Sequence, residues 1–205
     1  FNHGGQVSWS KNSEKLFFSA NRHEEGDYTP LNNEIFSIDV SSGKLKQLTD
    51  RFGPDNSPQV SPNGKLVAYR GYDDKFTNYE NTELYIMNPD GSNKRVLTRD
   101  FDRAVTGIQW AANSKGVYIQ YDDQGKTTLA YQPLKGKRKV ITDKIGGTAF
   151  GRPYSGGDFD IANNGTVAFT YSDPLRPADI ATTRKEKTTL LTELNKDALT
   201  HKELG

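Results

Sequence analysis

The sequence predicts an all-β fold, and three observations lead to that prediction. Short apolar segments recur at a fixed spacing, turn-forming residues separate them, and no long helical pattern interrupts them. The segments cover residues 16–19, 66–69, 116–119 and 166–169. Their second residues, Phe17, Val67, Val117 and Val167, are fifty positions apart, so the chain contains a fifty-residue repeat.

Each repeat shows the same succession of strand and turn signals. A short first strand carries Trp9, Val60, Trp110 or Phe159, and the polar turn after it carries Asn12, Asn63, Asn113 or Asn163. The apolar segment follows as a second strand, and a third strand is clearest at 34–39 and 83–88. An apolar residue followed by Thr closes the repeats at 48–49, 97–98, 141–142 and 191–192. Asn and Gly suit these turns because they tolerate positive φ.

The repeats predict stacked sheets, because the strands have two unequal faces and one small sheet cannot bury both. Radial stacking of such sheets gives a β-propeller of typically 4–8 blades. We expect a partial propeller of about four blades with four antiparallel strands each. The expected blades cover approximately 1–55, 56–104, 105–153 and 154–192. Trp9 and Trp110 hold the same phase and are expected in the core between blades.

The end of the chain carries the one helical pattern. Leu194, Ala198 and Leu199 are spaced for one helix face, and Thr192 is placed to cap its start. We expect residues 193–205 to form an exit segment that leads towards a further domain.

Composition excludes several classes of function. A formal net charge of +1 provides no global field for nucleic acid, and no apolar run is long enough to span a membrane. The absence of Cys excludes disulfides, thiolate metal sites and a Cys nucleophile, and it favours the bacterial periplasm over the cytoplasm. No cofactor, metal, nucleic-acid or membrane partner is predicted.

The repeat resembles the TolB-type propeller repeat. The similarity covers a strand ending in Ser-Pro-Asn-Gly-Lys, then Leu-Val-Ala-Tyr, Leu-Tyr-Ile-Met-Asn-Pro-Asp-Gly and a closing Leu-Thr, all within 59–98. The loop at 19–25 and the ending at 190–205 resemble the propellers of the acylaminoacyl- and dipeptidyl-peptidase branch of the prolyl oligopeptidase family. This resemblance implies that the chain is part of a longer protein with an α/β-hydrolase domain.

The catalytic motif of that family is not found in this sequence. Its Ser stands on a G-x-S-x-G turn between strand and helix. The nearest string, residues 152–157, has Pro153 in place of the first Gly, so Ser155 is interpreted as a loop residue between blades. The histidines His3, His23 and His201 have no matching constellation of Ser and Asp. We therefore expect no catalytic residue in this chain.

Glu24 and Glu25 are the candidate binding residues. They lie in the string His-Glu-Glu-Gly-Asp at 23–27. In dipeptidyl-peptidase relatives, a pair of acidic propeller residues binds the free amino terminus of the substrate, since paired carboxylates hold an ammonium. A solvated loop between strands explains the same residues, and the two interpretations stay open. The spacing does not suit a metal site.

Other motifs have structural explanations. Asp73-Asp74 and Asp122-Asp123 recur at one phase and predict turns, with calcium binding as the weaker alternative. The basic residues 135–139 suit the protection of a sheet edge, and residues 125–127 and 164–166 suit hairpin turns.

The sequence therefore predicts a non-catalytic propeller portion of a serine exopeptidase or oligopeptidase. This portion would gate and help bind peptide substrates for a hydrolase domain outside the chain. The alternatives are a TolB-like periplasmic binding propeller without enzymatic activity and, third, a propeller lyase or sugar-binding protein. Open blade edges also predict self-association.

Overall fold

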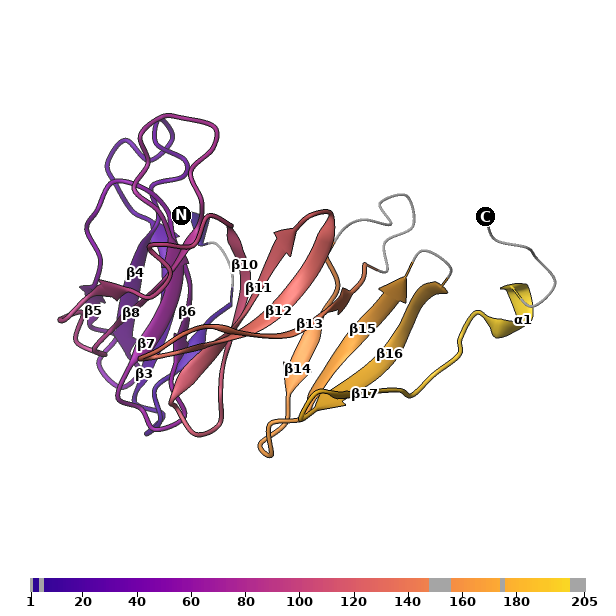
Figure 1. The fold of residues 1–205 in the computed structure, drawn as a ribbon. Helices are drawn as coiled ribbons and strands as arrows, with labels where there is room; N and C mark the ends of the chain where they lie inside the picture. The colour runs from indigo at the N-terminus through magenta and orange to yellow at the C-terminus, as the bar shows by residue number, and fades with distance from the viewer. Residues whose placement is uncertain (1, 4–5, 148–155, 174–175, 200–205) are drawn as a thin grey trace.

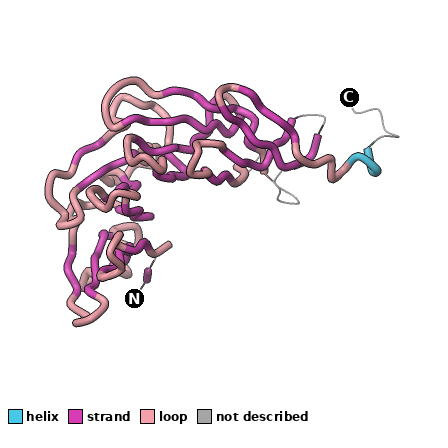
Figure 2. Tube along the Cα trace, turned by 90° about the horizontal axis from the view of Figure 1, so that it is seen from below, coloured by secondary structure: helices cyan, strands magenta, loops and turns pink. Residues whose placement is uncertain are grey.

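The computed structural model describes residues 2–3, 6–147, 156–173 and 176–199, and nearly all its regular structure is antiparallel sheet (Figure 1). Three hydrogen-bonded sheets follow one another along the chain. Figure 2 shows them arranged as an arc rather than as a closed ring. Within the described ranges, no helix is long and apolar enough to cross a membrane.

The first sheet has five strands in the order β1-β3-β4-β5, with β2 also paired to β3. The second sheet has four strands in the order β6-β7-β8-β9. The strands of the first are β1 (Asn2–His3), β2 (Ser8–Trp9), β3 (Lys15–Asn21), β4 (Glu34–Asp39) and β5 (Leu45–Gln47). Those of the second are β6 (Asp55–Val60), β7 (Val67–Gly71), β8 (Glu83–Met87) and β9 (Arg95–Val96).

The third sheet has eight strands and contains both remaining repeats. Its two halves are joined by the single pair Ile145↔Tyr171 between β13 and β15. The strands are β10 (Val105–Trp110), β11 (Gly116–Asp123), β12 (Lys126–Pro133), β13 (Lys139–Ile145), β14 (Phe159–Ile161), β15 (Val167–Asp173), β16 (Arg176–Arg184) and β17 (Lys187–Leu190). The all-β prediction is confirmed, while the sheets number three because two repeats share one hydrogen-bonded ladder.

The polar turn of each repeat forms in the same way. An Asn side-chain oxygen accepts a hydrogen bond from the backbone N–H two residues later, and the residue between them has positive φ. The accepting residues are Asn12, Asn63, Asn113 and Asn164, with donor–acceptor distances of 3.4, 3.0, 2.9 and 2.9 Å. The residues between are Ser13, Gly64, Ser114 and Gly165. The sequence assigned Asn163 to the fourth turn, but Asn164 occupies this position.

The core lies between successive sheets. Phe17 and Ile35 of the first sheet pack against Val67 and Met87 of the second. A second cluster joins the second sheet to β10–β12, and a third lies among β12, β13, β15 and β16. The four residues that share one position of the repeat, Phe17, Val67, Val117 and Val167, are all buried.

The two tryptophans differ in environment, which corrects the prediction that both are core residues. Trp110 is 6% exposed, and its indole N–H donates to Gln59 O at 2.9 Å across the gap between sheets. Trp9 is 52% exposed. Trp110 contacts the sheet of the preceding repeat. Among the described residues no sheet precedes the first one, so Trp9 has no such partner.

The C-terminal helix is α1 (Lys196–Leu199), shorter than the predicted pattern, whose residues 200–205 lie outside the described part. Thr192 does not cap this helix. Its hydroxyl donates to Asp179 Oδ1 at 2.8 Å and accepts from Ile180 N at 2.8 Å, so it closes the last repeat instead.

Candidate functional site

Glu24 and Glu25 lie on the loop between β3 and β4, residues 22–33, which Asn21 holds from its base. The Asn21 side-chain amide donates to Gly26 O at 3.3 Å and to Thr29 O at 2.7 Å. The backbone bonds Gly26 N to His23 O and Tyr28 N to Glu25 O close successive turns. A Cβ at position 26 would lie 2.8 Å from Asn21 Oδ1, so a larger residue there would displace the side chain that holds the loop. The loop therefore has a defined conformation.

Both candidate carboxylates face solvent. Glu24 and Glu25 are exposed, and the ion pairs of the described residues do not include either of them. Neighbouring exposed carboxylates without a cation are free to accept an ammonium group.

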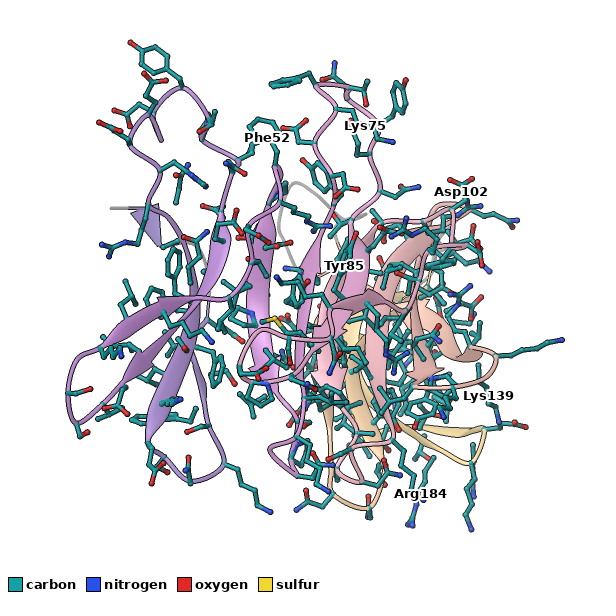
Figure 3. All side chains as sticks on the ribbon, turned by 90° about the vertical axis from the view of Figure 1, so that its left-hand side faces the viewer. Phe52, Lys75, Tyr85, Asp102, Lys139 and Arg184 are labelled. Carbon is teal, nitrogen blue, oxygen red and sulfur yellow. The ribbon has the colours of Figure 1, made fainter. Side chains whose placement is uncertain are left out.

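Exposed aromatic rings lie on this loop and on two other loops at the same end of the molecule. Phe52 and Phe76 contact each other at 5.3 Å between ring centroids. Tyr28, Phe76 and Tyr79 are largely exposed. Figure 3 shows Phe52 and Lys75 at this end, far from Arg184. We call the loops 22–33, 51–54 and 72–82 the loop end; it combines free carboxylates with apolar surface.

A rim pocket of about 680 Å³ lies on the same side, beside the 72–82 loop. Its lining mixes aromatic and charged groups, including Tyr72, Tyr79, Glu80, Arg99 and Asp102. The loop is braced by Glu80, whose Oε1 accepts hydrogen bonds from Lys75 N at 3.1 Å and Thr77 N at 3.2 Å. The Thr77 hydroxyl also donates to Glu80 Oε1 and is the main cause of the lowered pKa of Glu80, to which the backbone N–H groups add.

Beneath the loop end lies a buried polar cluster that the sequence analysis did not single out. Glu34 begins β4, and its Oε2 accepts a hydrogen bond of 2.6 Å from the Thr49 hydroxyl. Glu34 Oε1 is buried without a hydrogen bond, 3.7 Å from His23 Nε2. Burial raises the pKa of Glu34 to about 7. His23 thus connects the exposed loop to this cluster.

The second half of the cluster is an ion pair between the first two sheets. The Arg51 guanidinium contacts Asp55 Oδ1, lies 3.4 Å from Asp73 Oδ1 and stacks 4.2 Å from the Tyr85 ring centroid. Burial raises the pKa of Asp55 to about 6, although the adjacent Arg51 opposes the shift. The cluster joins β4, β6 and β8, so it positions the loops above it.

A repeated Thr contact was the signal that could have revealed Glu34. The closing Thr of a repeat accepts a hydrogen bond from the second residue of the third strand, as in Thr49 with Ile35 N and Thr98 with Leu84 N. An acid stands one position earlier, at Glu34, Glu83 and Asp179. The third repeat departs from this pattern, because the Thr142 hydroxyl accepts from Lys144 N.

The remaining motifs have structural contacts. Asp74 Oδ1 accepts from Phe76 N at 2.7 Å, as the turn interpretation predicts, while Asp73 pairs with Arg51. Asp122 Oδ1 accepts from the Thr127 hydroxyl at 2.7 Å, and Asp123 pairs with Arg103 at 2.9 Å. No group of three His, Cys, Asp or Glu residues suited to a metal occurs among the residues searched, which are those the structure describes.

The predicted hairpin turns form at Gln124-Gly125 and at Gly165, where φ is positive. In the basic segment, Lys139 pairs with Glu186 at 2.7 Å, and the Arg138 guanidinium lies 3.5 Å from the Phe101 ring centroid. Ser155 and His201 lie outside the described residues, as does the side chain of His3.

The stacked sheets and their repeated turns define the class of fold as a propeller-type array. By fold, the chain is similar to the Pyrococcus horikoshii acylaminoacyl peptidase, with a TM-score of 0.72 and 16% identity over 97% of this chain and 28% of that one. It is also similar to TolB from Acinetobacter baumannii, with a TM-score of 0.66 and 17% identity over 93% of this chain and 44% of that one.

By sequence, the chain is similar to dipeptidyl-peptidase 5 of Porphyromonas gingivalis, with 25% identity over 176 residues, which is 84% of the chain. The chain spans about a quarter of that relative, 24% of its length. A comparison with protein-family models gave no match. The resemblance to the TolB-type propeller region of peptidases of the prolyl oligopeptidase family is thereby confirmed.

Proposed function

We propose that the chain is a non-catalytic propeller portion of a serine exopeptidase or oligopeptidase. It gates the access of peptides to an α/β-hydrolase domain and helps to bind them. The observation that supports this proposal most strongly is the loop end, where the free carboxylates of Glu24 and Glu25 lie on a loop held by Asn21. The similarity to dipeptidyl-peptidase 5 supports this assignment.

The proposed roles follow from the chemistry of the loop end. Glu24 and Glu25 hold the ammonium of a free peptide amino terminus, and the aromatic rings of Phe52 and Phe76 contact the apolar side chains of the peptide. The proposed propeller has four blades, with the eight-stranded sheet divided at the pair Ile145↔Tyr171. The His23 contact with Glu34 fixes the loop relative to the blades.

The test uses the complete gene product and dipeptidyl chromogenic substrates. Glu24→Gln and Glu25→Gln each raise KM by about tenfold, because a charge-assisted hydrogen bond contributes about 1.5–3 kcal/mol. Glu186→Gln, at an exposed carboxylate of the β16–β17 hairpin, is the matched control and leaves KM unchanged. Equal KM values for wild type and both loop variants would contradict the role of this pair.

The second candidate is a TolB-like binding propeller with no enzymatic activity. The fold similarity to TolB over 93% of this chain favours it. This candidate predicts that the complete gene product does not react with a fluorophosphonate, a reagent specific for activated serines. Labelling of a serine outside residues 1–205 supports the peptidase proposal instead.

A further inference from the structure

A polar groove of about 770 Å³ crosses β6, β10 and β14, the first strands of three successive repeats. It is distinct from the loop end, and its lining includes Arg70, Gln59, Gln109, Gln120, Asp158 and Asp160. The volume is in the range of small-molecule binding sites.

Arg70 brings an uncompensated positive charge to one end of the groove. Its Nη2 donates to Ser57 Oγ at 3.0 Å, and its Nη1 donates to Val105 O at 3.3 Å and to Thr106 O. All three acceptors are neutral, and Nε is buried without a partner. Burial lowers the pKa of Arg70.

Several other arginines are paired with carboxylates. Arg51, Arg103 and Arg176 contact Asp55, Asp123 and Asp179 respectively. No ion pair of the described residues includes Arg70. A desolvated cation without a counter-ion is costly, so this end of the groove favours an anionic ligand group.

The β14 end of the groove carries negative charge. Asp160 Oδ1 accepts hydrogen bonds from Gln109 Nε2 at 2.7 Å and from Ile161 N at 2.8 Å. These bonds lower the pKa of Asp160, so its carboxylate is ionised at neutral pH. Asp158 adds a second carboxylate to the lining. The two ends of the groove therefore have opposite charge.

Three glutamine side chains connect these ends. The Nε2 atoms of Gln59, Gln109 and Gln120 donate to Ile108 O at 2.8 Å, Asp160 Oδ1 at 2.7 Å and Gly157 O at 3.1 Å. Each amide nitrogen is thus oriented by the protein. The Oε1 atoms accept no hydrogen bond from the described residues, so they are available to the N–H groups of a ligand.

We propose that this groove binds a short zwitterionic peptide, with its carboxylate at Arg70, its ammonium at Asp158 and Asp160, and its peptide N–H groups at the glutamine Oε1 atoms. Both ends of the ligand are required, because a ligand with one charge leaves the charged group at the other end of the groove unpaired. The inference goes beyond the proposed peptidase role and does not depend on Glu24 or Glu25.

The test is a titration of the isotopically labelled 205-residue chain, followed by nuclear magnetic resonance of its glutamine side-chain amides. Triglycine is the probe, with triglycinamide and N-acetyltriglycine as its matched controls. Triglycine shifts the NH₂ signals of Gln59, Gln109 and Gln120, and both controls bind at least about tenfold more weakly. Gly-Glu-Gly-amide tests the source of the carboxylate. If it binds as triglycine does, the anion can also come from an acidic side chain.

Variants of Arg70 test whether its positive charge binds the carboxylate of the peptide. Arg70→Gln weakens triglycine binding by about tenfold and leaves triglycinamide binding unchanged, whereas Arg70→Lys retains part of the affinity. Arg95→Gln, at an exposed arginine of β9 outside the groove, binds as wild type does. Equal binding of triglycine and triglycinamide to the wild-type chain would overturn the proposal, even if Arg70→Gln does not fold. Shifts confined to residues 22–33 would overturn it as well.

Discussion

The hydroxyl of Thr49 donates a hydrogen bond of 2.6 Å to the buried Glu34 and accepts one of 2.8 Å from Ile35 N. One side chain thus connects the end of a repeat to the start of its third strand. The same arrangement joins Thr192 to Asp179 and Ile180 in the last repeat. The closing Leu-Thr pair therefore holds the third strand in the first, second and fourth repeats.

Replacing Thr49 by Val tests the contribution of these hydrogen bonds to stability. Thr49→Val leaves both Glu34 Oε2 and Ile35 N without their partner in a buried environment, so we expect a loss of about 2 kcal/mol in the free energy of unfolding. Urea denaturation measures the change. Thr188→Val on β17, an exposed position of the same residue type, alters stability by less than about 0.5 kcal/mol. Equal stability of the two variants would show that the hydroxyl contributes nothing specific.

The pKa of Glu34 predicts a pH-dependent stability. Burial raises this pKa from 4.5 in the unfolded chain to about 7, so the folded state binds the proton more tightly. The resulting stabilisation is complete below the unfolded pKa and is lost as the pH rises through about 7. Glu34→Gln removes this titration, and we expect it to gain about 2 kcal/mol over wild type between about pH 5 and pH 8.

Urea denaturation of both proteins at each pH measures this gain. Asp90→Asn, at an exposed turn, is the control and gives no such gain over this pH range. A constant difference in stability between Glu34→Gln and wild type across the range would contradict the raised pKa.

The two tryptophans predict unequal costs of truncation. Trp110→Ala removes a buried ring and its hydrogen bond to Gln59 O, and we expect a loss of about 3–5 kcal/mol. Trp9→Ala removes a half-exposed ring and costs less than about 1 kcal/mol. Denaturant unfolding of the two variants measures the contrast. Similar costs would place Trp9 in a packed environment in solution.

Exposed apolar residues in and beside the first sheet predict self-association of the chain. Val7, Trp9 and Val40 are each more than half exposed. Exposed apolar surface and open sheet edges favour pairing with a second copy. Light scattering is expected to show a mass that rises with concentration, and Trp9→Lys is expected to reduce that rise. A monomeric mass at all concentrations would contradict this prediction.

The sequence predicted the repeat well because its signals are local. Phe17, Val67, Val117 and Val167 were aligned by their fifty-residue spacing alone, and all four are buried. The exposure of Trp9 could not be predicted in this way, since phase alone does not show whether another sheet packs against a given strand. Thr192 was predicted to cap a helix because a helical pattern follows it directly. The same residue is also the closing Thr of the last repeat, and this is the role that the structure shows.

The sites were harder to predict than the fold. Glu24 and Glu25 were recognised from a resemblance, and their role stays a proposal. The buried cluster of Glu34 and Arg51 and the groove at Arg70 are built from residues far apart in sequence. A single charged residue within a strand gives no signal of the sheet that will pack against it. Only the fifteen-residue spacing of Thr49 from Glu34, repeated in Thr98 and Glu83, was present in the sequence to be found.

Hydrolysis of aminoacyl and dipeptidyl chromogenic substrates tests the central claim most directly. The complete gene product is expected to cleave them and to lose this activity with a serine-reactive inhibitor, whereas residues 1–205 alone are expected to cleave none. A complete gene product without activity would contradict the peptidase assignment and favour a binding propeller. Inhibitor-sensitive cleavage by residues 1–205 alone would contradict the claim that this portion is non-catalytic.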